Sequence, residues 1–143
     1  MKVKIKICGV LDHHIMSVIS DLNVDYVGLV FFEKSPRNLS IEKAKSIIKC
    51  LSNSTKIVAL TVNATDQFLK NIVTNLSPDY IQLHGKETPF RCFEIKKKFK
   101  TKIIKAISAK SSKSLNFEIN KYKFITDKII IDSPKDHLPG GNG

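Results

Sequence analysis

The sequence lacks long apolar runs, and this absence argues against membrane proteins first. No uninterrupted apolar stretch approaches the roughly 18 residues that a membrane-spanning helix needs. The start of the chain, MKVKIKICGV, alternates basic and apolar residues instead of passing from a basic region into an apolar one. We therefore expect neither a signal peptide nor a membrane anchor, and we predict no membrane partner.

Cysteines are also few, and they lie far apart in the chain at Cys8, Cys50 and Cys92. There is no CxxC pair and no histidine at a metal-ligand spacing, so neither a disulfide framework nor a zinc site is expected. Unpaired thiols suit a reducing compartment. We predict a cytoplasmic protein.

Arginine is scarce as well, although the chain is strongly basic. Its 24 Lys and Arg against 13 Asp and Glu give a formal net charge of +11, but arginine occurs only as Arg37 and Arg91. Arginine is the better residue for bidentate contacts with phosphates and bases. Because the excess is lysine spread over many segments, we favour a solvated lysine-rich surface over a nucleic-acid interface, and we predict no nucleic-acid partner. A general attraction for anionic metabolites is the third reading.

Short β-branched and apolar runs alternate with longer amphipathic stretches along the whole chain, which indicates an α/β fold with a parallel sheet. Strands are expected over 3–7, 26–32, 56–62, 80–83, 103–107 and 128–131, and helices over 12–22, 40–51, 65–76, 88–98 and 111–122. Ser40, Thr65 and Thr88 stand where N-caps of three of these helices belong. No composition break divides the chain, so 1–143 is predicted to be a single domain.

The short βα repeat is typical of a (βα)8 barrel, the TIM-barrel type, of which about the first six units are present. Eight strands are needed because closure removes the edges of the sheet. The domain is therefore expected to be incomplete. Exposed edges would pair with a second copy of the chain or with a complementing segment.

In such a barrel the active site lies at the carboxyl ends of the strands, so the residues after each apolar run carry the chemistry. These motifs, in chain order, are KICG at 6–9, FEKSPR at 32–37, VN at 62–63, QLHG at 82–85, KA at 105–106, IDS at 131–133 and PGGNG at 139–143. Each is weak alone. Together, in this order and over essentially the whole chain, they resemble the phosphoribosylanthranilate isomerase family of tryptophan biosynthesis.

The resemblance implies an isomerase that performs an Amadori rearrangement without metal or organic cofactor. Its substrate would be a small anionic phosphosugar, N-(5-phosphoribosyl)anthranilate, and its product 1-(2-carboxyphenylamino)-1-deoxyribulose 5-phosphate. The reaction needs an acid that protonates the furanose ring oxygen and a base that removes the proton from C2. By match to the family pattern, Asp132 is the general acid and Cys8 the general base.

The same resemblance implies the substrate contacts. Arg37 would pair its planar guanidinium with the anthranilate carboxylate. His84 either orders a loop at the barrel mouth or faces the substrate, and it is kept as a candidate substrate contact outside the catalytic pair. The family's glycine-rich loop after the sixth strand, whose missing side chains let the backbone approach an anion or let the loop close, is matched by Gly140, Gly141 and Gly143.

Structural roles compete with these functional ones. Cys8 could be a small buried apolar residue, Asp132 a turn or helix cap, and Arg37 a surface charge. The motif context favours function. Two other readings of the chain stay open: a catalytically inactive partial barrel that acts as an interaction or degenerate protein, and a basic nucleic-acid-binding module. A sister barrel enzyme such as indole-3-glycerol phosphate synthase is disfavoured, because its Lys and Glu pattern is not found at these strand ends.

Overall fold

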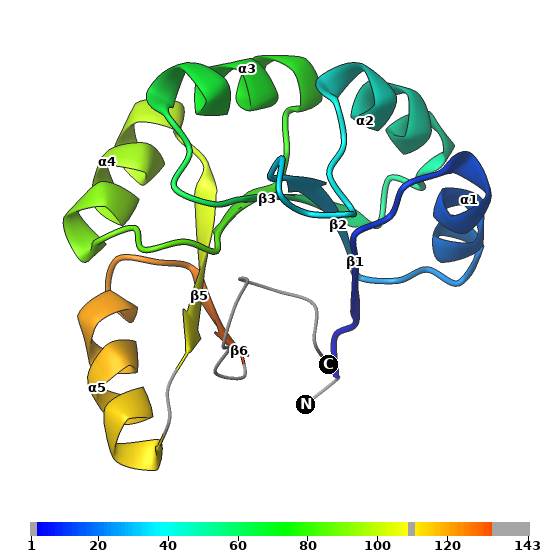
Figure 1. Cartoon of the computed structure of the whole chain (residues 1–143). Helices are drawn as coiled ribbons and strands as arrows, with labels where there is room; N and C mark the ends of the chain where they lie inside the picture. The colour runs from blue at the N-terminus through cyan, green and yellow to red at the C-terminus, as the bar shows by residue number, and fades with distance from the viewer. Residues whose placement is uncertain (1–2, 109–110, 133–143) are drawn as a thin grey trace.

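The computed structural model describes residues 3–108 and 111–132, and six parallel strands in them form one curved sheet. The strands lie side by side in chain order, and the helices between them cover the convex side of the sheet (Figure 1). The strands are β1 Lys6–Cys8, β2 Tyr26–Phe31, β3 Lys56–Thr61, β4 Tyr80–Leu83, β5 Lys102–Ser108 and β6 Lys128–Asp132. The helices are α1 His13–Asp21, α2 Ile41–Ile47, the 3-10 turn η1 Ile48–Cys50, α3 Asp66–Leu76, α4 Pro89–Phe99 and α5 Ser112–Tyr122. The alternation confirms the predicted barrel-type α/β fold with six strands present.

The helices begin where their N-caps predict. Side-chain oxygens of Ser40, Thr65 and Thr88 each accept a hydrogen bond from the backbone N–H three residues later, which satisfies one of the unpaired donors at a helix start. The expected helix over 40–51 is divided, because α2 tightens into the 3-10 turn η1. In the described part of the chain no helix is long and apolar enough to cross a bilayer.

Side chains of successive strand residues alternate between the inside and the outside of the curved sheet. The register pairs even with even positions throughout, for example Val58 with Tyr80 and Tyr80 with Lys102. Even-numbered apolar residues form the inner cluster, which contains Tyr26, Val58 and Ile104, with Tyr80 and Ile130 packed against them. Even strand positions therefore point into the barrel, and odd ones point toward the helices.

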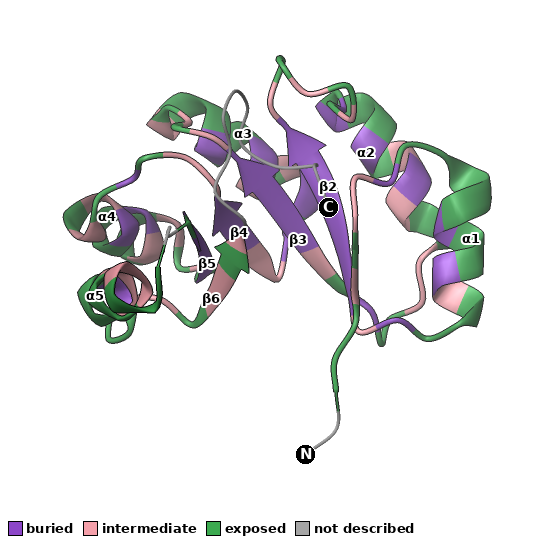
Figure 2. Ribbon diagram, turned by 60° about the horizontal axis from the view of Figure 1, so that its bottom comes forward, coloured by how far each residue is buried: buried purple, intermediate pink, exposed green. Residues whose placement is uncertain are grey.

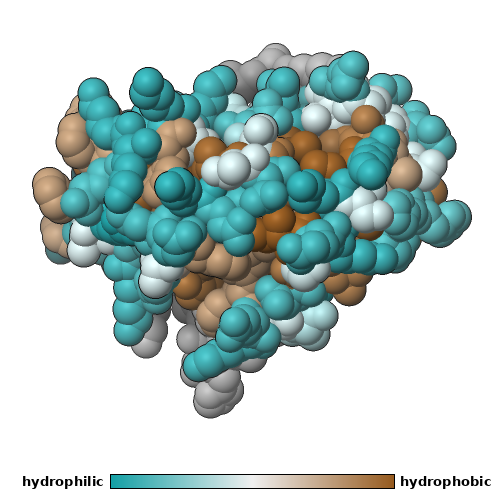
Figure 3. Space-filling view, turned by 90° about the horizontal axis from the view of Figure 1, so that it is seen from above, coloured by the Kyte–Doolittle hydropathy of each residue, from teal (hydrophilic) through white to brown (hydrophobic). Residues whose placement is uncertain are grey.

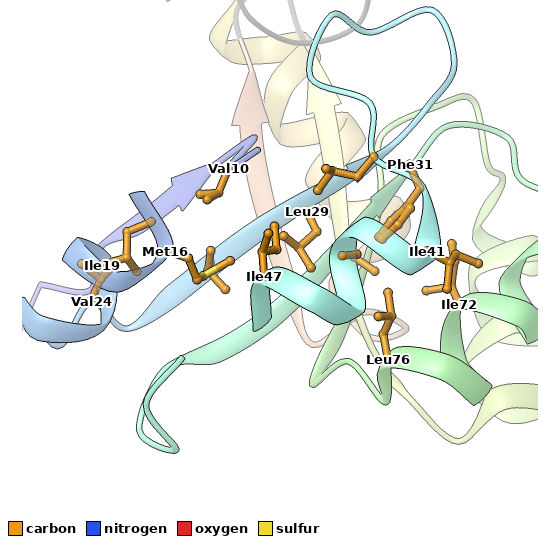
Figure 4. Close-up of a cluster of buried hydrophobic side chains, with 14 residues drawn as sticks. Val10, Met16, Ile19, Val24, Leu29, Phe31, Ile41, Ile47, Ile72 and Leu76 are labelled. Carbon is orange, nitrogen blue, oxygen red and sulfur yellow. The ribbon is translucent and has the colours of Figure 1, made fainter. Parts of the chain in front are cut away.

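The outer layer between sheet and helices holds most of the hydrophobic core. Figure 4 shows Leu29 and Phe31 of β2 in one cluster with Met16 of α1 and Ile41 and Ile47 of α2. Further along the sheet, β4, β5, α4 and α5 contribute to a second cluster that includes Ile81, Leu83, Cys92, Ile95 and Tyr122. All six residues of β2 are buried, and Figure 2 shows β2 in purple over its length. Apolar packing on both faces explains why the strands read as continuous apolar runs.

Aspartates before three of the strands tie the amino ends of neighbouring strands together. Asp25, Asp79 and Asp127 accept hydrogen bonds from the backbone N–H groups of Ile5, Ile57 and Ile103 respectively, at 2.8–2.9 Å. Burial raises the pKa of Asp127, but the Ile103 N–H and the Lys96 ammonium outweigh it, so the pKa of this carboxyl lies below its usual value. These residues brace the end of the sheet opposite to the candidate site.

Both edges of the sheet are open within the described residues. There β1 pairs only with β2, and β6 only with β5. Ile7 and Ile131, which point outward from these edge strands, are exposed. The outer surface over the helices at the top of Figure 1 is mostly hydrophilic, with a smaller apolar area, as Figure 3 shows.

Candidate active site

Three of the predicted site residues lie at the carboxyl ends of strands on the inner side of the sheet. Cys8 ends β1, Asp132 ends β6, and His84 follows β4 directly. The even positions of Cys8 and Asp132 place them on the inner face, as a role across the barrel interior requires. His84 continues the same alternation beyond Gln82.

A chain of hydrogen bonds crosses the interior of the sheet and ends at Asp132. The Nζ of Lys6 donates to Oε1 of Gln82 at 2.8 Å, and Nε2 of Gln82 lies 2.9 Å from Nδ1 of His84. The Nε2 of His84 lies 3.1 Å from Oδ2 of Asp132. Lys6, Gln82 and Asp132 come from β1, β4 and β6, which are not neighbours in the sheet. The curvature of the sheet is what brings them within contact.

Arg37 lies against the end of β1, beside Cys8. Its Nη1 donates to the carbonyl oxygen of Cys8 at 3.2 Å, and its own backbone N–H donates to Oγ of Ser35 at 3.1 Å. Gly9 has a φ of +83°, and a Cβ there would come within 2.4 Å of the Cδ of Arg37. The glycine of the KICG motif is therefore needed for both the backbone turn and the close approach of the guanidinium. The structure thus brings Arg37 and Cys8 together.

Gly28 of β2 makes room for the Cys8 side chain. The two residues are partners in the strand register, and a Cβ on Gly28 would lie 2.6 Å from the Sγ of Cys8. Cys8 is only half-buried, and it is not part of the hydrophobic clusters that the described residues form. This placement does not match that of a small core residue.

Lys105, in the middle of β5, points outward and away from these residues. Its ammonium is buried between sheet and helices, where it donates to the carbonyl oxygens of Leu83 and Gly85 and to Oε2 of Glu87 at 3.0 Å. The side chains of Lys105 and Glu87 are 3% and 4% exposed. All three protons of the ammonium have acceptors, so this buried cation is satisfied.

Glu87 fixes the loop that carries His84. Its two carboxylate oxygens accept from the backbone N–H groups of Asn63, at 2.8 Å, and Gly85, at 3.0 Å. The Asn63 side chain in turn accepts from the N–H of Lys86. The sequence motifs include Asn63 and Lys105 without assigning a role to either, and nothing in the sequence singles out Glu87. The loop after β4 is therefore tied to β3 and β5 from the outer side.

Helices α4 and α5 pack over the polar cluster formed by Lys105, Glu87 and Asn63 on the outer side of the sheet. The hydroxyl of Tyr122 donates to the carbonyl oxygen of Glu87 at 3.0 Å. Burial raises the pKa of Tyr122, and it raises the pKa of the Cys92 thiol to about 11. Cys92 is therefore a packing residue whose thiol stays protonated at neutral pH.

A groove on the outer rim lies between the loops that follow β2 and β3. Residues from the starts of α2 and α3 line it, together with Phe32, Asn38 and Asn63. Its lining includes none of Cys8, Arg37, His84 and Asp132. The groove is therefore distinct from the residues at the strand ends.

The predicted glycine-rich loop and the question of a metal site complete the comparison of the predicted site with the structure. Gly140, Gly141 and Gly143, the predicted anion-binding loop, lie outside the described residues. Among the residues that are described, no three His, Cys, Asp or Glu side chains are grouped so that they could hold a metal ion.

Comparison with known proteins identifies the family. The family model described as N-(5'-phosphoribosyl)anthranilate (PRA) isomerase matches residues 5–143. The chain belongs to this isomerase family. The N-(5'-phosphoribosyl)anthranilate isomerase of Bradyrhizobium diazoefficiens is 40% identical to it over 100% of the chain and 65% of the relative.

Solved structures of the same family share the fold. The phosphoribosylanthranilate isomerase of Thermotoga maritima superposes with a TM-score of 0.84 at 26% identity, over 99% of this chain and 66% of that one. A second structure, with a TM-score of 0.81 at 27% identity over 92% of this chain and 66% of that one, is a complex with reduced 1-(o-carboxyphenylamino)-1-deoxyribulose 5-phosphate. The chain spans about two thirds of the length of these relatives.

Proposed function

We propose that this site catalyses the Amadori rearrangement of N-(5'-phosphoribosyl)anthranilate to 1-(2-carboxyphenylamino)-1-deoxyribulose 5-phosphate, in tryptophan biosynthesis. The observation that carries the proposal is the placement of Cys8 and Asp132 at the carboxyl ends of β1 and β6, on the inner face. Membership of the isomerase family supports it. So does the relative that holds a reduced form of the product.

In the proposed mechanism two groups act in turn. Asp132 donates a proton to the furanose ring oxygen as the bond from that oxygen to C1 breaks, which leaves a protonated Schiff base at C1. Cys8, as thiolate, removes the proton from C2 to give an enolamine. Protonation at C1 and loss of the C2 hydroxyl proton then yield the ketone. The bonds balance without an added oxidant or reductant, and no cofactor is part of the proposal.

Arg37 is the proposed partner of the anthranilate carboxylate. Its guanidinium lies next to Cys8, and it uses one Nη1 contact on the Cys8 carbonyl. Its fork can meet a second planar acceptor, which favours a carboxylate. The proposed substrate contacts of Gly140, Gly141 and Gly143 rest on the family pattern.

The activity is proposed for a closed barrel. Within the described residues both edges of the sheet are open, so a closed barrel includes further βα units beside β1 and β6. A cytoplasmic location is part of the proposal and is supported by three free thiols.

The test follows the loss of anthranilate-type fluorescence when the 143-residue chain is added to freshly made substrate. We expect Cys8→Ala and Asp132→Asn each to lower turnover by about 10²-fold or more, the usual range for removal of a general acid or base. Cys50→Ala, which removes an exposed cysteine, is the matched control and should keep parent turnover. Variants within a few fold of the parent would contradict both assignments.

A folded parent chain without turnover is tested again after addition of a segment with the last two βα units of a relative. Restored turnover supports the closed-barrel enzyme. Continued absence of turnover, with the segment bound, favours the inactive partial barrel.

A further inference from the structure

In the series of hydrogen bonds that ends at Asp132, Lys6 decides which atoms donate and which accept. An ammonium can only donate, so the amide atom of Gln82 that faces Lys6 at 2.8 Å has to be the carbonyl oxygen. Gln82 is 2% exposed, so water does not compete for its amide. The amide nitrogen is thereby directed to the other side, toward His84.

The orientation of Gln82 decides which ring nitrogen of His84 carries the proton. An amide nitrogen is a donor only, so Nδ1 of His84, 2.9 Å away, has to accept. A neutral imidazole with an accepting Nδ1 carries its proton on Nε2. The Nε2–H then points to Oδ2 of Asp132 at 3.1 Å, and the ring donates to the carboxylate.

We propose that Lys6 and Gln82 are positioning residues that hold His84 as the Nε2–H tautomer, so that His84 is a fixed hydrogen-bond donor to Asp132. The catalytic meaning of this inference rests on the proposed function. Because Oδ2 accepts from the ring, the proton that Asp132 transfers belongs on Oδ1. After that transfer the new carboxylate keeps a donor in place, which stabilises the charge that develops during ring opening.

The tautomer is measured directly by ¹⁵N NMR of the histidine ring in the chain without substrate, at about pH 8, where an unperturbed histidine is neutral. Protonated and unprotonated nitrogens of a neutral imidazole resonate far apart. We expect His84 to show a proton on Nε2 and none on Nδ1. A protonated Nδ1 in the parent chain overturns the proposal, and no variant is needed for this result.

Gln82→Glu tests the direction of the chain with almost no change of shape. A carboxylate can only accept, so both Lys6 and Nδ1 of His84 would have to donate to it. We expect both ring nitrogens of His84 to carry protons in this variant at the same pH. Gln67→Glu, an exposed position on α3, is the control and should leave the ring signals unchanged. An unprotonated Nδ1 in Gln82→Glu overturns the proposal.

Lys6→Met tests the origin of the direction. Without the ammonium both amide orientations are open to Gln82, so the signals of the two ring nitrogens of His84 should move toward each other. Lys102→Met removes the same charge from the amino end of β5, where the ammonium lies 5.7 Å from the ring centroid of Tyr80, and should leave them in place. Signals in Lys6→Met identical to those of the parent overturn the role of Lys6.

The kinetic readout separates this inference from the proposed function. In an active assembly Gln82→Glu should lower kcat at least tenfold with a much smaller change in KM, because it alters the donor to Asp132 and leaves the proposed carboxylate contact of Arg37 unchanged. A shift confined to KM overturns the positioning role. The ring signals of His84 test the tautomer even where the chain shows no turnover, so the two proposals can fail independently.

Discussion

Replacing Lys105 with methionine is expected to lower the free energy of unfolding by about 3–5 kcal/mol, because it leaves a buried carboxylate without its cation. The Nζ of Lys105 lies 3.0 Å from Oε2 of Glu87, and both side chains are almost fully buried. The same ammonium donates to the carbonyl oxygens of Leu83 and Gly85, so three hydrogen bonds are lost together. Methionine keeps an unbranched stem, so little of the loss comes from packing.

Urea unfolding followed by circular dichroism measures this change. The control is Lys56→Met, which removes the cation of an exposed pair with Asp79 at 3.2 Å and should lower the stability by less than about 1 kcal/mol. In a double-mutant cycle, Lys105→Met combined with Glu87→Gln should lose about 1–3 kcal/mol less than the sum of the single changes. If Lys105→Met is as stable as Lys56→Met, the buried pair does not hold the loop after β4.

Two further predictions concern a packing contact and a titrating group. Gly28→Ala should displace the Sγ of Cys8, because the new Cβ would lie 2.6 Å from it. We expect the free energy of unfolding, measured in urea, to fall by about 1–3 kcal/mol and turnover to be reduced. Parent-like values of both would contradict the close contact. The lowered pKa of Asp127 means that its stabilising contribution is present above the pKa of an unfolded aspartate, about 3.9, and is lost as the pH falls through the lower folded value. Asp127→Asn should remove this part of the acid destabilisation, and an unchanged slope of stability against pH in this range would refute the assignment.

The alternation of strands and helices could be predicted because it depends on local sequence patterns. Strands buried on both faces are continuous apolar runs, as in β2, and the helix starts carry side-chain caps such as Ser40 and Thr65. The pattern predicts a strand over 3–7, whereas β1 is Lys6–Cys8. Among the described residues its extent depends on pairing with β2, and pairing with a distant segment leaves no mark in the local sequence.

The positions of the site residues could be predicted better than the faces they occupy. Cys8, His84 and Asp132 lie at the carboxyl ends of strands, as the barrel rule requires. Lys105 belongs to the same series of motifs but points outward, and the run IIKAI around it has no alternation that would show this. Glu87 lies in a loop without periodicity, so its burial could not be inferred from the sequence.

The loop after β4 joins two polar networks that lie on opposite faces of the sheet. Inside the barrel, Lys6 fixes the orientation of the Gln82 amide, the amide fixes the tautomer of His84, and His84 donates to Asp132. Outside, Glu87 and Lys105 hold the backbone of the same loop by its N–H and C=O groups. Side-chain hydrogen bonds alone would leave His84 free to move with its loop, because a ring position is only as fixed as the backbone that carries it. The buried ion pair of Lys105 and Glu87 therefore holds the loop in place, so that the hydrogen bonds inside the barrel keep the His84 donor on Asp132.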